Sequence, residues 1–249
     1  MKICAAQTKS VKGDIQNNIE NHLKLIDLAV HNRADIIIFP ELSLTGYEPS
    51  LSKVLATDQN DNRFNEFQRI SNTQKMTIGI GIPTKSKEGV CISLVLFQPH
   101  HIRKKYSKKY LHPDENEFFT SYESFPTLMI DEPQIAFAIC YELSVTEHAE
   151  NAFKKGASIY MASVAKFVNG VNKANKRLSE IAQKYSMTVL MSNCVGQSDG
   201  QVCGGKTSIW NANGLLVAQL NDVDQGLLIF DTVTQEVIER YYNNGTIVE

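Results

Sequence analysis

The chain has 249 residues, of which 43% are hydrophobic and 21% are charged, and its formal net charge is −2. This length and composition are expected for a soluble globular protein with a well-buried core. The nearly balanced charge gives no whole-molecule field that favours nucleic acid or an anionic membrane as a partner.

The cysteines and the absence of long apolar stretches bear on the compartment. The number of cysteines is odd and no Cys-x-x-Cys pair occurs, which argues against a disulfide framework and a zinc ribbon: Cys4, Cys91, Cys140, Cys194 and Cys203. No stretch approaches the roughly 20 apolar residues of a membrane span. The N-terminus lacks the apolar run of a signal peptide. We therefore expect a cytoplasmic protein without a membrane partner.

The first half of the chain predicts strands and helices in alternation. Strands are predicted where apolar residues run together, at 3–7, 35–39, 76–82 and 89–97, with a turn at 85–89. Helices are predicted where apolar residues recur at helical spacing, at Ile19, Leu23, Ile26 and Val30 and again at Phe64, Phe67 and Ile70.

The second half continues the same pattern. Strands are predicted at 125–130, 134–139, 158–164, 189–194, 207–210, 215–220 and 227–230. One helix carries Glu147, Asn151 and Lys154 before Gly156, and another carries Ala174, Leu178, Ile181 and Tyr185. Asn213-Gly214 predicts a hairpin turn. No repeat or linker divides the chain, so we expect a single domain over 1–249, with helices on the outer faces of sheets.

A cysteine stands where the apolar strand at 135–139 ends, in Cys140-Tyr141-Glu142. A thiol at that place is held by a rigid element and can face a cleft. A lone free cysteine is nevertheless more often a small buried hydrophobe than a nucleophile. The interpretation therefore depends on what else lies at the ends of strands.

Two further segments supply charged groups in comparable places. Pro40-Glu41 follows the strand at 35–39, and Lys108 precedes a loop that carries Glu115. A carboxylate, an ammonium group and a thiol together suit acyl transfer, because one removes a proton, one stabilises developing negative charge and one attacks.

These segments resemble the three signatures of the nitrilase or carbon–nitrogen hydrolase superfamily. They occur in order as Pro40-Glu41 with Gly46-Tyr47, as Tyr106-Ser-Lys108-Lys-Tyr-Leu111, and as Cys140-Tyr141-Glu142. The likeness runs from the strand at 3–7 to the strand near 227–229. It implies an α/β fold, a four-layer α-β-β-α sandwich with the site at the sheet ends, and a homodimer or larger homo-oligomer.

The resemblance also implies roles for four catalytic residues. Cys140 is expected to be the nucleophile, Glu41 the general base, and Lys108 the cation that holds the oxyanion together with the backbone N–H of Tyr141. Glu115 is expected to orient the lysine. The basic run at 103–109 leaves Lys109 as the alternative to Lys108, and Glu117 competes with Glu115.

Four residues near these motifs are expected to bind substrate: Tyr47, Tyr141, Glu142 and Asn193. A structural hydrogen-bonding role is an equal alternative for each of them. The histidines show no metal-ligand spacing, and Gly204-Gly205-Lys206-Thr207 lacks the rest of a phosphate-binding loop. We therefore expect neither a metal nor a cofactor.

The implied function is a thiol hydrolase that cleaves the C–N bond of a small linear carboxamide or N-carbamoyl compound through a thioester. Two segments depart from the family pattern and leave the substrate open, Leu143-Ser-Val-Thr-Glu147 and Ser163-Val-Ala-Lys166. The segment 40–47 also resembles the glutaminase domains of the superfamily. The alternatives are nitrile hydrolysis by the same triad, and a non-catalytic interaction protein that uses the basic run as a docking or nucleic-acid patch.

Overall fold

The computed structural model describes residues 1–122, 134–243 and 246–248, so the strand expected at 125–130 lies outside the described residues. The described strands form an eight-stranded sheet in the order β15-β14-β13-β1-β2-β3-β4-β5, a five-stranded sheet in the order β12-β11-β8-β7-β6, and a two-stranded ribbon, β10-β9.

The larger sheet consists of β1 (Lys2–Gln7), β2 (Ile36–Ile38), β3 (Thr77–Lys85), β4 (Val90–Phe97), β5 (Lys104–Ser107), β13 (Gln225–Asp231), β14 (Val237–Asn243) and β15 (Thr246–Val248). The smaller sheet consists of β6 (Ile135–Ile139), β7 (Ile159–Ser163), β8 (Thr188–Ser192), β11 (Ser208–Trp210) and β12 (Leu216–Gln219), and the ribbon of β9 (Gln197–Ser198) and β10 (Gln201–Val202). The α-helices are α1 (Ile15–His31), α2 (Ser52–Leu55), α3 (Asn65–Gln74), α4 (Thr146–Lys154) and α5 (Val168–Tyr185). Short 3-10 turns are η1 (Pro49–Leu51), η2 (Asn62–Phe64), η3 (Pro113–Glu117) and η4 (Cys140–Ser144).

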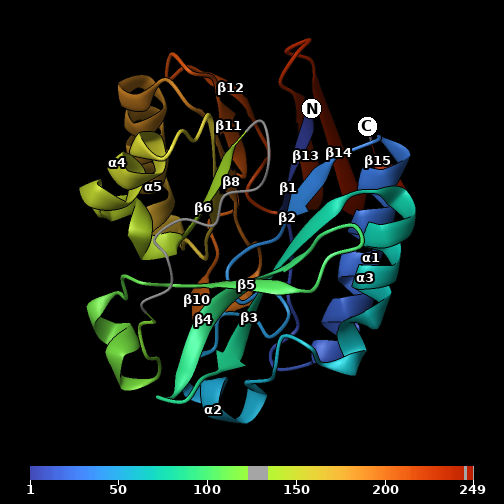
Figure 1. Ribbon diagram of the computed structural model, residues 1–249, viewed down its shortest axis with the longest axis vertical. Coiled ribbons are helices and arrows are strands. Elements are labelled where there is room, and N and C mark those ends of the chain that lie inside the picture. The colour runs from blue at the N-terminus through green and yellow to red at the C-terminus, as the bar shows by residue number, and fades with distance from the viewer. Residues whose placement is uncertain (123–133, 244–245, 249) are drawn as a thin grey trace.

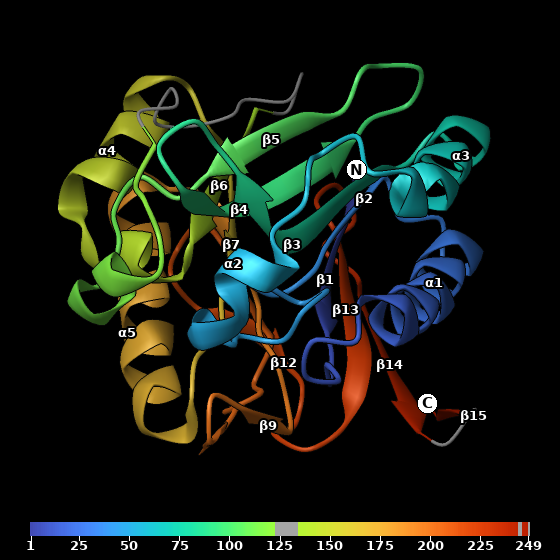
Figure 2. The ribbon, with the colours of Figure 1, turned by 90° about the horizontal axis from the view of Figure 1, so that it is seen from below.

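The two larger sheets lie face to face between two pairs of helices (Figure 1). Helices α1 and α3 cover the outer face of the larger sheet, and α4 and α5 cover the smaller one, which the view from below shows from a second direction (Figure 2). This is the four-layer α-β-β-α sandwich that the sequence predicted.

Alternation along β2 explains why this strand is apolar throughout. Ile36 and Ile38 belong to the core cluster that includes the smaller sheet, whereas Ile37 belongs to the cluster beneath α1 and α3. Successive strand side chains point to opposite faces, and both faces of this strand are covered.

Parallel strands bring the carboxyl ends of both sheets to one region of the molecule. β1, β2 and β3 are parallel neighbours, and so are β6, β7 and β8. Near these ends the sheets are joined by side chains: Ser163 Oγ donates to the Phe39 carbonyl over 2.8 Å, and Ser192 Oγ donates to the Ala6 carbonyl over 2.6 Å. The loops that follow β2 and β6 therefore start from fixed positions.

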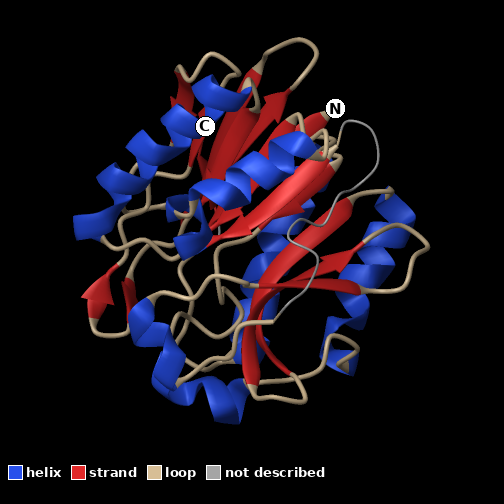
Figure 3. Ribbon diagram, turned by 60° about the vertical axis from the view of Figure 1, so that its left-hand side comes forward, coloured by secondary structure: helices blue, strands red, loops and turns tan. Residues whose placement is uncertain are grey.

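Figure 3 shows the strands in red, and the sequence did not predict all of them. β5 is the sequence Lys-Lys-Tyr-Ser, and it forms because it pairs with β4 along the edge of the sheet. β14 pairs with β13 and was also not predicted; polar residues interrupt its apolar ones at Glu239, Arg240 and Asn243. The Asn213-Gly214 turn between β11 and β12 was correctly predicted, and Gly214 has a φ of 78°. Among the described residues, no helix has both the length and the apolar character of a membrane span.

Candidate active site

The thiol of Cys140 is positioned by a sharp backbone turn at the end of β6. Cys140 has a φ of 41°, a left-handed value that non-glycine residues seldom adopt, and it opens η4. The turn takes the chain out of the sheet at once, and Cys140 keeps 9% of its surface exposed. The thiol therefore lies at the boundary between the core and the space at the strand ends.

The carboxylate of Glu142 stabilises this turn through hydrogen bonds. Its Oε2 accepts from the Ile139 N–H over 2.8 Å, and its Oε1 accepts from the Lys109 N–H over 2.7 Å. Oε2 also accepts from the Tyr106 hydroxyl over 2.6 Å. Every carboxylate oxygen thus has a protein partner, and the residue is fully buried. These bonds favour the structural hydrogen-bonding alternative for Glu142, which joins the turn of Cys140 to the loop of Lys108.

Glu41 follows β2 in a loop that packs tightly on β3. A Cβ at Gly81 would lie 2.2 Å from the Pro40 carbonyl oxygen and 2.5 Å from the Leu42 nitrogen, so only glycine permits this approach. The Glu41 N–H donates to the Val164 carbonyl over 3.3 Å, just beyond β7. The side chain is 2% exposed and points into the protein.

Lys108 lies between two carboxylates. Its Nζ is 2.7 Å from Glu41 Oε1 and 2.7 Å from Glu115 Oε1, and the side chain is completely buried. The geometry therefore selects Lys108 over Lys109, whose Nζ lies 5.3 Å from the centre of the Tyr110 ring. It also selects Glu115 over Glu117, which is exposed.

Glu115 is held from two sides. Its Oε1 also accepts from the Tyr47 hydroxyl over 2.9 Å, and its Oε2 accepts from the His112 N–H over 2.8 Å. Burial first, and then the nearby carboxylates Glu41 and Glu115, raise the pKa of Tyr47, so its hydroxyl stays a donor. Tyr47, expected at the substrate, thus completes the shell around Glu115 and also meets the Phe167 ring edge-on at 6.1 Å.

One oxygen of this cluster has no protein partner. Oε2 of Glu41 is buried and accepts no hydrogen bond from the described residues. A buried acceptor is normally satisfied. Burial raises the pKa of Glu41, while Lys108 acts in the opposite direction. The unpaired oxygen is thus both available and more basic than that of an ordinary surface carboxylate.

Charges around Cys140 act in both directions. Burial raises the pKa of its thiol and Glu41 adds to that effect, whereas Lys166 and Lys108 lower it. Burial lowers the pKa of Lys108, but Glu41, Cys140 and Glu115 raise it by a larger amount. This lysine therefore keeps its charge. The buried groups are coupled, and a thiol proton can pass to the carboxylate with little change in net charge.

Lys166 lies beside the thiol, although the motifs did not indicate it as a site residue. Its pKa is raised chiefly by the negative charge of the Cys140 thiolate, and Glu41 adds to that effect. The departure Ser163-Val-Ala-Lys166 was the only signal in the sequence. The position of Lys166 near Cys140 follows from the parallel pairing of β6 and β7, because the carboxyl ends of these strands lie side by side.

Asn193 holds the backbone of Lys166. Its Oδ1 accepts from the Lys166 N–H over 2.8 Å, and its Nδ2 donates to the Lys166 and Gly205 carbonyls over 3.1 and 2.7 Å. These bonds use its polar atoms fully and the residue is buried. Asn193 is therefore a positioning residue, and the expected substrate contact is not supported.

Tyr141 is the remaining residue expected at the substrate. It is half-buried, its ring meets that of His112 edge-on at 5.0 Å, and it lines a cavity of about 610 Å³. Lys166 and Leu143 line the same cavity. The cavity is thus bounded by Tyr141, the residue after Cys140, and by Lys166.

The basic run at 103–109 does not form one patch. Arg103 donates to the Gln59 and Asp61 carbonyls and to Asn65, Lys105 donates to the Lys85 carbonyl, and Lys108 is buried in the cluster. These bonds direct the side chains of Arg103 and Lys105 onto neighbouring backbone, whereas Lys104 is exposed. Among the described residues, no group of three or more His, Cys, Asp and Glu side chains is arranged to hold a metal ion.

Comparison with known proteins places this geometry in a family. The model of the carbon–nitrogen hydrolase family matches residues 2–242. A glutamine-dependent NAD(+) synthetase from Aquifex aeolicus is 24% identical over 96% of this chain, which spans only 43% of the length of that relative.

Solved structures share the fold. An amidase from Nesterenkonia sp. AN1, as a variant of its active-site cysteine in complex with butyramide, has a TM-score of 0.85 and 21% identity, covering 94% of this chain and 92% of its own. The same amidase, with an acetamide moiety covalently added at its active-site cysteine, has a TM-score of 0.83 and 21% identity over 92% of this chain and 89% of its own. The protein described here belongs to the carbon–nitrogen hydrolase family and has the fold of a nitrilase-superfamily amidase, as its three motifs predicted.

Proposed function

We propose that the protein hydrolyses the C–N bond of a small linear carboxamide or N-carbamoyl compound through a thioester on Cys140, releasing ammonia or an amine. The observation that carries this proposal is the cluster in which Lys108 bridges Glu41 and Glu115 while the second oxygen of Glu41 stays unpaired. A merely structural ion pair has no need of a buried free acceptor.

The first half of the reaction forms the thioester. Sγ of Cys140 bonds to the amide carbon while its proton passes to Oε2 of Glu41. An ammonium group has three donors, and Lys108 uses two of them on Glu41 and Glu115, so one remains for the oxyanion together with the Tyr141 N–H. Glu41 then returns the proton to the nitrogen, the C–N bond breaks and the amine leaves.

The second half regenerates the thiol. Glu41 takes a proton from water while the water oxygen bonds to the thioester carbon. The C–S bond breaks, the sulfur regains a proton, and the carboxylic acid departs. One amide and one water thus give one acid and one amine, and each group ends in its starting protonation state.

Two similarities support an amide substrate. The Nesterenkonia amidase shares the fold and is seen with butyramide, a small linear amide. The same protein carries a covalent acetamide moiety on its active-site cysteine. At this level of identity the likeness supports the proposal and does not fix the acyl group.

Ammonia release from a panel of linear amides, N-carbamoyl compounds and nitriles tests the proposal. We expect turnover of at least one amide or N-carbamoyl compound, and its loss in Cys140→Ala with an unchanged circular dichroism spectrum. Cys91→Ala is the matched control, because Cys91 is equally internal but lies in β4. Turnover of nitriles alone, or full activity of Cys140→Ala, would reject the proposed reaction.

A further inference from the structure

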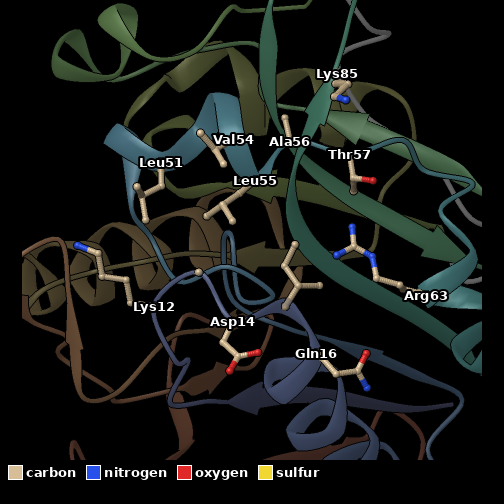
Figure 4. Close-up of a pocket in the computed structure, with 12 residues that line it drawn as sticks. Lys12, Asp14, Gln16, Leu51, Val54, Leu55, Ala56, Thr57, Arg63 and Lys85 are labelled. Atoms are coloured by element: carbon tan, nitrogen blue, oxygen red, sulfur yellow. The ribbon is translucent and has the colours of Figure 1, made fainter.

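Two cavities differ in their relation to the catalytic cluster. The larger, of about 770 Å³, lies between the start of α1 and the α2 region, and it is lined by residues such as Asp14, Leu55 and Lys85 (Figure 4). It contains no residue of the cluster, and its Lys12 and Arg63 are paired with Glu48 and Asp61. The smaller cavity, of about 610 Å³, also contains no residue of the cluster, but its lining includes Tyr141, which follows Cys140, and Lys166, on whose ammonium group Cys140 acts most strongly.

The smaller cavity has an excess of positive charge. Its lining includes Lys166, Lys173, Lys176 and Arg177, and the one acidic side chain is Glu180. Glu180 Oε2 already lies 3.6 Å from Arg177 Nη1. Within the described ranges, the ammonium groups of the three lysines have no ion-pair partner among the carboxylates.

The cationic wall is attached to rigid elements. Lys173 and Arg177 are four residues apart and lie on one face of α5, together with Gly170 and Ala174. Arg177 Nε donates to the Leu143 carbonyl over 2.9 Å, which fixes α5 against η4. The backbone of Lys166 is held by Asn193 and by the Gly204 N–H, which donates to its carbonyl over 2.7 Å. The backbone positions that carry these charges are therefore fixed relative to η4, which begins at Cys140.

We infer, resting on the proposed function, that the preferred substrates are linear amides whose acyl chain ends in a carboxylate, and that this cavity holds the carboxylate. Cationic groups without partners favour an anionic ligand, and the volume is in the range of small-molecule sites. Lys166, next to the thiol, and Lys173 and Lys176, farther along α5, would receive the charged end while the amide carbon lies at Sγ. A neutral acyl chain would leave this positive charge uncompensated.

Matched substrates test the inference directly. The monoamides of linear dicarboxylic acids are compared with the neutral amides of the same chain length, by kcat/KM for ammonia release. We expect the charged amides to be preferred by roughly ten- to hundredfold, the usual scale of a hydrogen bond to a charged group. The preference should shrink as salt is added, because screening weakens interactions with exposed lysines.

Variants of the cavity lysines test whether the cavity causes the preference for charged amides. The double variant Lys173→Gln/Lys176→Gln should bring the ratio of the two kcat/KM values towards one. Lys184→Gln, an exposed lysine in the last turn of the same helix, should leave the ratio as it is. An unchanged ratio in the double variant would overturn the assignment.

A binding measurement separates this inference from the proposed function. Titration calorimetry with Cys140→Ala and a dicarboxylic monoamide needs no turnover. Binding that is weakened by adding Lys166→Gln supports the cavity even if no amide is hydrolysed, an outcome that would reject only the proposed function. Equal turnover of charged and neutral amides, or no binding difference between them, would overturn the inference and leave the amidase reaction standing.

Discussion

Lys108 is the residue on which the chemistry of the site depends. Two carboxylates share its ammonium group inside the protein, each at 2.7 Å. A buried charge needs such partners, and here they leave one N–H for a developing oxyanion. Its neighbour Lys109 has the same side chain in a half-buried position and contributes only its backbone N–H, to Glu142.

Lys108→Ala should therefore lower kcat by at least about two orders of magnitude, the usual effect of losing an oxyanion donor. Lys109→Ala, the matched control, should retain activity because it preserves the backbone N–H. Steady-state ammonia release with the best amide measures both. Equal rates in wild type and Lys108→Ala would transfer the role to another cation.

The charge of Lys166 makes a second prediction at this scale. Burial and Glu41 raise the pKa of the Cys140 thiol, so its labelling by iodoacetamide should increase as the pH rises through the neutral and alkaline range. Lys166 lowers that pKa. Lys166→Gln should thus raise the pKa and shift the labelling curve to higher pH.

The labelling rate of the Cys140 peptide against pH, read by mass spectrometry, checks this shift. Lys166→Arg keeps the positive charge and should restore most of the wild-type curve, and Lys184→Gln should not alter it. Identical curves for wild type and Lys166→Gln would show that the ammonium group does not act on the thiol.

The sequence identified the candidate catalytic residues better than it predicted the contacts of their neighbours. Glu41 and Cys140 could be named because each follows a predicted strand, whereas Lys108 was named by its motif alone, since β5 before it was not predicted. The sequence could not choose between substrate contact and structural hydrogen bonding for Glu142 and Asn193, because adjacency to a reactive residue does not reveal the direction of a side chain. The left-handed turn at Cys140 changes that direction within one residue.

At the scale of elements, the closest approach is between β3 and the loop after β2. Gly81 leaves room for the Pro40–Leu42 backbone, which carries Glu41. The sequence predicts both strands, yet it cannot show that their ends press together. That contact depends on the parallel register in which Ile38 pairs with Gly79.

Gly81→Ala should destabilise the protein by about 1–3 kcal/mol, the usual cost of overpacking, and should lower activity by displacing Glu41. Gly170→Ala is a matched control for stability, because its nearest neighbour, Lys166 Cδ, is 3.9 Å from the added Cβ. Alanine inside a helix is better than glycine by roughly 0.5–1 kcal/mol, so this control should be neutral or more stable. Urea denaturation of the three proteins decides, and an unchanged midpoint for Gly81→Ala would contradict the account.

Strands without apolar patterning were the elements that the sequence missed. β5 consists of Lys104 to Ser107, and only Tyr106 and Ser107 are buried. Pairing with β4 defines it, and pairing partners are not visible in a local window. This matters for function, because the end of β5 is what delivers Lys108 to the two carboxylates.

At the scale of the whole molecule, each of the two sheets contributes part of the candidate active site. The larger sheet supplies Glu41 and Lys108, and the smaller one supplies Cys140 and Lys166. The α-β-β-α arrangement follows from the resemblance and not from periodicity, which indicates strands and helices without their order in space. The extent of the domain over 1–249 stays a prediction.

The assembly state is also a prediction at this scale. The family resemblance implies a homodimer. Light scattering should therefore give a mass of about twice the 27.9 kDa of the chain. A single species at the monomer mass across a wide range of concentrations would refute it.

The central claim is that Cys140 carries the acyl group between amide and acid. Rapid acid quenching during turnover, followed by mass spectrometry of the peptide that contains Cys140, tests it most directly. The account predicts an added mass equal to that of the acyl group on Cys140, formed with each amide that is hydrolysed and absent from Cys140→Ala. Continued ammonia release with Cys140 unmodified, or with the acyl group on another residue, would contradict it.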